Sequence, residues 1–298
     1  MGRPMIYLAC ALIHMFQRNC FLTLNYITDM FPFLHLSDPH ISSRKDSEVY
    51  GIKPYRKLEA VVESICDIDT HPAFVLITGD ISYDGTVESY HLVKNLLQKI
   101  ESGNIPVYFA LGNHDNRINF RKVFENNSTG PYYHCFEHDP LRVIVLDSYR
   151  TGTRYGYFDG DQFDWLEKTF CSEPDRPTVI AFHHTLKQYQ PEFDVRTIHE
   201  SHQKQFFETI QDRNVIGILN GHLHFNQSAI VNGVLNVMVG STGAELSYND
   251  TEYSIIDTSC YNIVFYREGS LFIKTIYVPC KGGVLTQGPI ERLVGIRT

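Results

Sequence analysis

Hydrophobic and polar positions follow two alternating patterns along most of the chain. Short continuous apolar runs, which are typical of buried strands, occur at residues 31–36, 73–77, 107–111, 142–146, 179–182 and 215–219. Between them, apolar residues spaced three and four apart predict helices at residues 55–67, 86–102, 161–170 and 199–212. Strands that alternate with helices indicate crossover units and a layered α/β core.

The pattern changes from Gln227 onward. Short β-type runs at residues 234–239, 261–266 and 271–278 are separated by turn residues such as Glu268 and Gly269. We therefore expect the C-terminal part to form a second sheet that packs against the first. Residues 30–298 contain no repeat or linker, and we interpret them as one domain.

The first 29 residues carry a different signal. The apolar stretch from Met5 to Phe16 is too short for a membrane span. It could be a weak signal-peptide core, because Arg3 precedes it, but His14 interrupts it and Arg18 follows closely. We interpret residues 1–29 as a poorly ordered extension or a wrongly included start, with a signal, an anchor or a structured helix as the alternatives.

Composition excludes several classes of protein. With 298 residues, 43% hydrophobic and 20% charged, the chain is typical of a globular protein. Lys and Arg number 26 against 34 Asp and Glu, which argues against a basic nucleic-acid surface. A phosphate-handling enzyme stays possible, since a metal ion can supply positive charge. The seven cysteines include no Cys-x-x-Cys pair, so we expect no disulfide framework and a cytoplasmic location, unless residues 1–29 prove to be a signal.

Five predicted strands are followed directly by residue types that bind metals. These residues are Asp38 and His40, Asp80, Asn113 and His114, His183 and His184, and His222 and His224. Sites in open α/β sheets form beyond the carboxyl ends of strands, so these side chains are expected to converge. Carboxylate, amide and imidazole ligands suit first-row divalent ions such as Mn, Fe or Zn. Each fragment alone is common, but all five at strand ends predict a site for two metal ions that share a carboxylate. Two such ions can hold a phosphate group between them while a nucleophile displaces the leaving group at phosphorus.

The fragments read SDPH, TGD, GNHD, FHH and GHLH, and this order resembles the calcineurin-like metallophosphoesterase superfamily over roughly two thirds of the chain. Softer features resemble its cyclic-nucleotide and glycerophosphodiester phosphodiesterase subgroup: Asp84-Gly85, Tyr90, Arg117, Leu146-Asp147-Ser148, and Gln162 to Trp165-Leu166. The resemblance implies a four-layer α-β-β-α sandwich, with two mixed β-sheets flanked by helices and a dimetal site at the carboxyl ends of the strands.

The resemblance also implies a role for each matched residue. Asp38, His40 and His224 would hold the first metal, Asp80 would bridge both, and Asn113, His183 and His222 would hold the second. His114 would contact a phosphate oxygen or protonate the leaving alkoxide. His184 would line the pocket, Asp84 and Asp115 would orient imidazoles or metal-bound waters, and Arg117 would contact phosphate or pair with a carboxylate.

The implied activity is hydrolysis of a small phosphodiester, either a 3′,5′-cyclic nucleotide or a glycerophosphodiester, by attack of a hydroxide that bridges two ions (Mn²⁺, Fe²⁺/Fe³⁺ or Zn²⁺). Phosphomonoester hydrolysis and nucleotide pyrophosphate hydrolysis are the alternatives within the same superfamily. A non-catalytic scaffold is a third alternative, but the intact ligand set and His114 argue against it. A homodimer is possible, and we expect no membrane span.

Overall fold

The computed structural model describes residues 30–298, except for residues 126–129, 151–152, 154, 188–196, 250 and 291–298. The extension expected at residues 1–29 lies outside the described residues. Among the residues that are described, no helix combines the length and the hydrophobicity needed to cross a bilayer. The five cysteines in this part of the chain are free thiols.

The first sheet has five strands in the order β13-β12-β1-β2-β3. Its parallel strands are β1 (Phe31–Leu36), β2 (Val75–Thr78) and β3 (Val107–Ala110), and its antiparallel hairpin is β12 (Ser259–Arg267) with β13 (Ser270–Val278). The crossovers are α2 (Pro54–Cys66) and α3 (Val87–Glu101). Helix α3 begins where Thr86 accepts a hydrogen bond from the Ser89 amide, an N-cap that satisfies one of the helix's unpaired donors.

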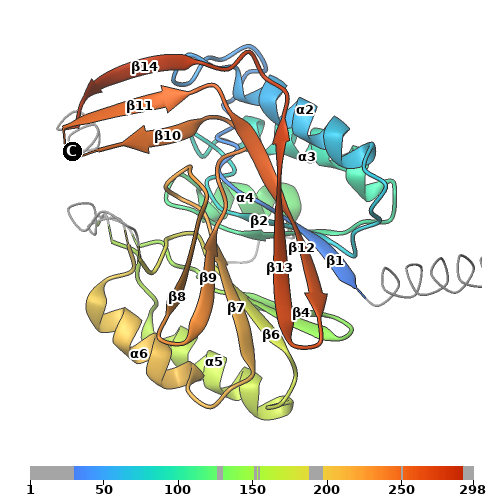
Figure 1. Ribbon diagram of the computed structural model, residues 1–298, viewed down its shortest axis with the longest axis vertical. Helices are drawn as coiled ribbons and strands as arrows, with labels where there is room; N and C mark the ends of the chain where they lie inside the picture. The colour runs from blue at the N-terminus through green and yellow to red at the C-terminus, as the bar shows by residue number, and fades with distance from the viewer. Residues whose placement is uncertain are drawn as a thin grey trace, which may run out of the picture.

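The second sheet has six strands in the order β4-β5-β6-β7-β9-β8. Its strands are β4 (His134–His138), β5 (Leu141–Val145), β6 (Thr178–Ala181), β7 (Val215–Asn220), β8 (Gln227–Val231) and β9 (Val234–Met238). Helices α5 (Gly160–Ser172) and α6 (Glu200–Ile210) pack on this sheet, while α4 (Arg117–Phe124) packs beside α3 on the first. Figure 1 shows the two helical layers on opposite sides of the paired sheets.

Burial explains why the strands are continuous apolar runs. Along β1, Leu34 and Leu36 join the core beneath α2 and α3, whereas Phe33 points into the core between the sheets. Along β2, Val75 and Ile77 face the helices and Leu76 faces the other sheet. Strands buried on both faces lose the alternation of half-exposed strands. The expected α-β-β-α sandwich is therefore confirmed.

The expectation that the C-terminal part forms the second sheet is wrong about which strands pair with one another. The region does not build the second sheet by itself: β12 and β13 extend the first sheet, and β8 and β9 extend the second. A third, three-stranded sheet forms from β10 (Glu245–Tyr248), β11 (Glu252–Ile256) and β14 (Val284–Pro289), over its own small core. Apolar runs reveal where strands lie, but the choice of partner depends on contacts distant in sequence, which periodicity does not encode.

Candidate metal centre

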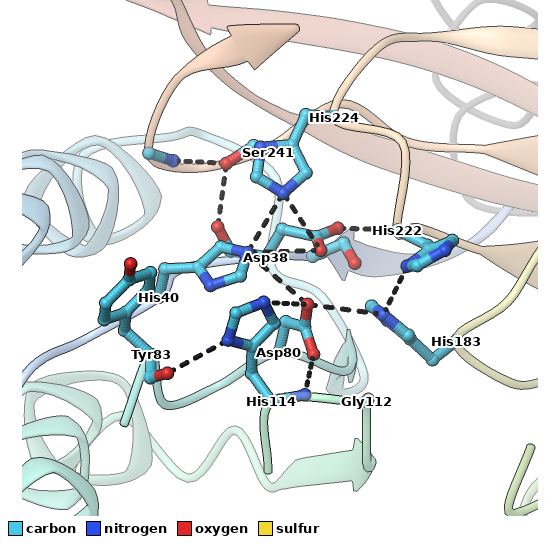
Figure 2. Close-up of polar contacts among 12 residues, drawn as sticks. Asp38, His40, Asp80, Tyr83, Gly112, His114, His183, His222, His224 and Ser241 are labelled. Atoms are coloured by element: carbon cyan, nitrogen blue, oxygen red, sulfur yellow. Dashed lines mark hydrogen bonds and ion pairs between the residues drawn. The ribbon is translucent and has the colours of Figure 1, made fainter. Parts of the chain in front are cut away.

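The carboxyl ends of five strands converge on one cluster of side chains. Asp38 and His40 follow β1, Asp80 follows β2, Asn113 and His114 follow β3, His183 follows β6, and His222 and His224 follow β7. Figure 2 shows these carboxylates and imidazoles turned toward one another. The strand ends that the sequence singled out therefore meet in one place, although they come from both large sheets.

The distances divide the cluster into groups of metal-ligand size. Ligand atoms lie within 4.8 Å of one another in three groups: Asp38 with His40 and His224, His40 with Asp80 and His114, and Asp80 with His183 and His222. Oδ2 of Asp80 lies 3.5 Å from Nε2 of both His40 and His183. Asp80 thus stands between the two ends of the cluster.

Asn113 joins the same cluster, since its Oδ1 lies 3.2 Å from Nε2 of His183. On the other side, Nε2 of His224 lies 3.4 Å from Oδ1 of Asp38 and 3.0 Å from Nε2 of His40. The structure therefore brings all seven residues expected to be ligands together. Two carboxylates, one amide and four imidazoles form a donor set that fits first-row divalent ions.

The backbone is strained where it carries these side chains. Five of the seven residues have a positive φ: Asp38 (53°), His40 (48°), Asp80 (47°), His222 (79°) and His224 (61°). Residues other than glycine rarely adopt this left-handed conformation, which costs about 1–2 kcal/mol each, and such strain gathers at functional sites. At these five positions the chain turns sharply, after β1, β2 and β7, and directs the side chains inward (Figure 2). The sequence did not predict these left-handed conformations, because the Asp-x-His pattern carries no information about backbone φ.

Three glycines leave room for the cluster. A Cβ at Gly79 would overlap the ring of His183, one at Gly112 would overlap Asp80, and one at Gly221 would overlap Ser37 and approach Oδ2 of Asp38 to 2.6 Å. The close approach of the loops thus requires glycine at these positions.

Hydrogen bonds fix the orientation of the side chains. The amide of His222 donates to Oδ2 of Asp38 (2.8 Å), and the amide of His114 donates to Oδ1 of Asp80 (2.7 Å). Nδ1 of His183 binds the carbonyl of Thr78 (2.8 Å), and Nδ1 of His224 binds that of Ala244 (3.1 Å). A carbonyl oxygen only accepts, so both rings carry a proton on Nδ1 and present Nε2 to the cluster, the arrangement usual for histidine ligands.

The carboxylates are held ionised despite their burial. Burial opposes the charge of Asp38, but attraction and hydrogen bonding from His224 and His40 keep its pKa well below the ordinary value. The pKa of Asp80 is likewise low, because His183 and His114 outweigh the effect of burial. Reciprocally, burial lowers the pKa of His183, but Asp80 outweighs it and raises the pKa to about 9. The cluster thus contains two buried carboxylates that stay ionised, the form in which a carboxylate binds a cation.

His114 lies between this cluster and a tyrosine. Its side chain is 13% exposed, with Nε2 at 3.9 Å from Oδ2 of Asp80. Nδ1 binds the carbonyl oxygen of Tyr83 at 3.0 Å. The ring of Tyr83 stacks on the imidazole, with centroids 5.4 Å apart. Sequence reasoning gave Tyr83 no role, since an isolated tyrosine is a core residue by default.

Asp84 and Asp115 brace the loops. Asp115 accepts from the amides of Gly112, Ile81 and Ser82 and from the hydroxyl of Tyr90. Asp84 accepts from the Ser43 amide and from the amide and hydroxyl of Thr86. These partners are amides and hydroxyls of the surrounding loops, and the expected role toward imidazoles or metal-bound waters stays a prediction.

Arg117 and His184 also have protein partners. Arg117 forms a two-pronged ion pair with Asp147 (Nε to Oδ2 2.6 Å, Nη2 to Oδ1 2.8 Å), which is the second of the two roles considered for it. His184 is buried at 2% exposure, with Nδ1 at 2.9 Å from the hydroxyl of Ser148. Its ring centroid lies 4.6 Å from that of His222, so the His184 ring packs against the imidazole of a candidate ligand.

The arrangement of the strand-end residues matches one family. The family described as calcineurin-like phosphoesterase matches residues 31–226. The chain belongs to this family. It is therefore a metal-dependent phosphoesterase, and its candidate metal centre lies where the five family fragments meet.

Two curated relatives are similar over most of the chain. A probable cyclic nucleotide phosphodiesterase from Rhodococcus erythropolis is 28% identical over 213 residues, which are 70% of each chain. A probable glycerophosphodiester phosphodiesterase from Arcobacter nitrofigilis is 26% identical over 225 residues, 72% of this chain and 79% of the relative.

Solved structures share the fold. A dimetal phosphatase from Danio rerio superimposes with a TM-score of 0.57 at 13% identity, covering 83% of this chain and 98% of that one. A purple acid phosphatase from yellow lupin (Lupinus luteus) gives 0.62 at 17% identity, covering 87% of this chain and 53% of that one. At these identities the likeness concerns architecture alone.

Proposed function

We propose that the protein is a phosphodiesterase that uses two metal ions to hydrolyse a 3′,5′-cyclic nucleotide or a glycerophosphodiester. The observation that carries this proposal is the position of Asp80. Its Oδ2 lies 3.5 Å from Nε2 of His40, in one group of imidazoles, and 3.5 Å from Nε2 of His183, in the other. The names of the two relatives, one for each substrate class, support the diester substrate.

The residues fit a pair of ions. Asp38, His40 and His224 would hold the first, Asn113, His183 and His222 the second, and Asp80 would serve both. The chemistry of the donor set is mixed oxygen and nitrogen without thiolate, which suits Mn²⁺, Fe²⁺/Fe³⁺ or Zn²⁺. Asp38 and Asp80 are both buried and both ionised, the form in which a carboxylate binds a cation. Two bound ions neutralise phosphate oxygens and lower the pKa of water.

His114 is the proton donor or hydrogen-bond donor in this proposal. The carbonyl of Tyr83 can only accept, so Nδ1 of His114 carries a proton and Nε2 is the ring nitrogen on the side of the cluster, 3.9 Å from Oδ2 of Asp80. An imidazolium at this position donates from Nε2 to the departing oxygen, and the bond to Tyr83 keeps the ring in place while it does so. Asp80, whose Oδ1 binds the amide of His114, sets the distance between donor and cluster.

A substrate panel tests the proposal. The protein is stripped of metal, reloaded with Mn²⁺ and assayed with adenosine 3′,5′-cyclic phosphate, a glycerophosphodiester, bis(p-nitrophenyl) phosphate, p-nitrophenyl phosphate and a nucleotide pyrophosphate. We expect turnover of the diesters to exceed that of the others and to disappear in Asp80→Asn. Preference for the monoester or the pyrophosphate would replace diester hydrolysis by one of the alternative reactions, and failure of all substrates would favour a non-catalytic scaffold.

A further inference from the structure

An aromatic corner lies against one end of the metal centre. The ring of Tyr83 stacks on His114 with an interplanar angle of 24° and lies 6.0 Å from the ring of His40. Tyr50 meets Tyr83 edge to face, at 6.1 Å and 89°. Three elements thus contribute rings to one surface: the turn before α2, the loop after β2 and the loop after β3.

The corner offers an accessible ring beside a largely buried cluster. Tyr83 is 36% exposed, whereas the side chains of His40 and His114 are 6% and 13% exposed. Figure 2 shows Tyr83 next to His40 and His114, at the end of the site away from His183 and His222. A substrate that reaches the cluster at this end would meet the ring of Tyr83.

Both tyrosines are held in place by their backbones. The Tyr83 amide donates to the carbonyl of Ile41 at 3.0 Å, and its own carbonyl accepts from His114. Tyr50 has a φ of 54° in the tight turn closed by Val49 and Ile52. A bulky residue in this left-handed conformation is unusual, so the turn holds Tyr50 where glycine or asparagine is normally found. The backbones are thus fixed, and the ring of Tyr83 packs against His114 and Tyr50, so it loses less freedom when a ligand stacks on it.

We infer that Tyr83 is a specificity-determining residue that stacks on the base of a nucleotide substrate. The inference rests on the proposed function and deepens it, because it selects the nucleotide over the glycerol diester. The backbone carbonyl of Tyr83 binds His114, the group that serves the departing oxygen in the proposed function, and the Tyr83 ring stacks on the same imidazole. The ring of Tyr83 therefore lies on the side of the leaving group. A phenol ring recognises a flat base by stacking, and it offers an aliphatic glycerol no such contact.

A quaternary ammonium headgroup is the competing occupant of an aromatic corner. Such a site binds the cation more tightly when a neighbouring carboxylate has an oxygen that is not already hydrogen-bonded to the protein. Asp84, the acid next to Tyr83, instead directs its oxygens to Ser43, Ser82 and Thr86. The observations therefore favour the base.

Matched substrates test this inference by kinetics. Tyr83→Ala, Tyr83→Phe and the control Phe272→Ala, a half-exposed aromatic of the edge strand β13, are assayed with adenosine 3′,5′-cyclic phosphate and with the methyl riboside 3′,5′-cyclic phosphate, which lacks the base. We expect Tyr83→Ala to lower kcat/KM for the first by about 5- to 100-fold, mainly through KM, and to leave the second within about twofold. Tyr83→Phe and Phe272→Ala should match the wild type.

Equal losses on the two substrates would overturn the inference and make Tyr83 a support of His114 only. A larger loss with glycerophosphocholine than with the cyclic nucleotide would also overturn it, in favour of the ammonium.

Binding separates this inference from the proposed function. Calorimetry of the Mn²⁺-loaded protein compares adenosine 5′-monophosphate with ribose 5-phosphate. We expect the wild type to prefer the former and Tyr83→Ala to lose the preference. If no diester is hydrolysed but this preference persists in the wild type and vanishes in Tyr83→Ala, the proposed function fails while the base-binding role stands. If the diesters are hydrolysed and no preference exists, the role of Tyr83 fails alone.

Discussion

The guanidinium of Arg117 holds the carboxylate of Asp147 through two parallel hydrogen bonds, and a third goes from Nη2 to the carbonyl of Tyr149 at 2.5 Å. Arg117 begins α4, on the first-sheet side, whereas Asp147 follows β5 of the second sheet. The pair therefore ties the loop of the second sheet to the helix that follows His114. Since the same loop carries Ser148, which binds His184, the pair also fixes a support of the metal centre.

We predict that Arg117→Lys lowers the free energy of unfolding by about 1–3 kcal/mol, because lysine cannot reproduce the two-pronged geometry. Asp147→Asn should cost a similar amount, and the double variant should cost less than the sum of the two. Denaturant unfolding of all three measures this coupling. Additive losses, together with a large rise in KM for Arg117→Lys alone, would show that Arg117 binds phosphate instead.

Gly221 is predicted to be intolerant of even a methyl group. Its Cβ would overlap Ser37 and press on Asp38, so Gly221→Ala should displace a ligand and reduce both metal content and turnover by at least about tenfold. Gly160→Ala is the matched control, because no atom of the described residues lies within 4 Å of its Cβ and it opens helix α5, where alanine is the better residue. Elemental analysis and a diesterase assay compare the two. Full metal occupancy in Gly221→Ala would show that the loop moves aside without cost.

Much of the site could be predicted from the sequence, because each ligand follows a strand that is buried on both faces and therefore reads as an uninterrupted apolar run. His183 after β6, which reads TVIA and is buried throughout, is the clear example, and before Asp38 only His35 interrupts the run of β1. Short or half-exposed elements carry no such signal: α4 has eight residues and β4 reads HCFEH, and both were missed. The partner of Arg117 and the stacking of Tyr83 on His114 depend on loops that meet only after folding. The positive φ of Asp38 depends on tertiary contacts in the same way.

Asp80→Asn should lose more metal than any variant of a residue that serves one ion. The amide keeps the shape of the side chain but removes the charge that faces both groups of imidazoles. We expect about two ions per wild-type chain, about one in His224→Ala and less than one in Asp80→Asn, by elemental analysis after dialysis against equal Mn²⁺. Two ions retained in Asp80→Asn would contradict the shared position.

His114→Ala should behave in the opposite way and keep its metal. The imidazole donates to substrate in our proposal, and removal of one such donor typically slows turnover by about 10²- to 10³-fold. Elemental analysis and the kcat with bis(p-nitrophenyl) phosphate are measured on the same preparation. Bis(p-nitrophenyl) phosphate, whose p-nitrophenolate leaves without a proton, should lose less turnover than adenosine 3′,5′-cyclic phosphate, whose departing alkoxide needs one. Unchanged turnover of both substrates would remove His114 from the chemistry.

Acid should destabilise the fold through a half-buried histidine remote from the metal centre. Burial lowers the pKa of His134, in β4, to about 4, against 6.5 for the unfolded chain, while Glu125 opposes this weakly. Between these values the unfolded chain binds more protons than the folded one, so stability falls as the pH drops from 6.5 toward 4, by about 1–3 kcal/mol for this residue.

His134→Phe should flatten that slope, because phenylalanine keeps the ring contact with Tyr132 and takes up no proton. Phe136→Leu, two residues along the same strand, is the control: it should lower the free energy of unfolding at every pH and leave the slope as steep as in the wild type. Urea unfolding at intervals from pH 7.5 to pH 4 gives the three slopes. Identical slopes in His134→Phe and the wild type would show that another group binds the proton that accompanies acid unfolding.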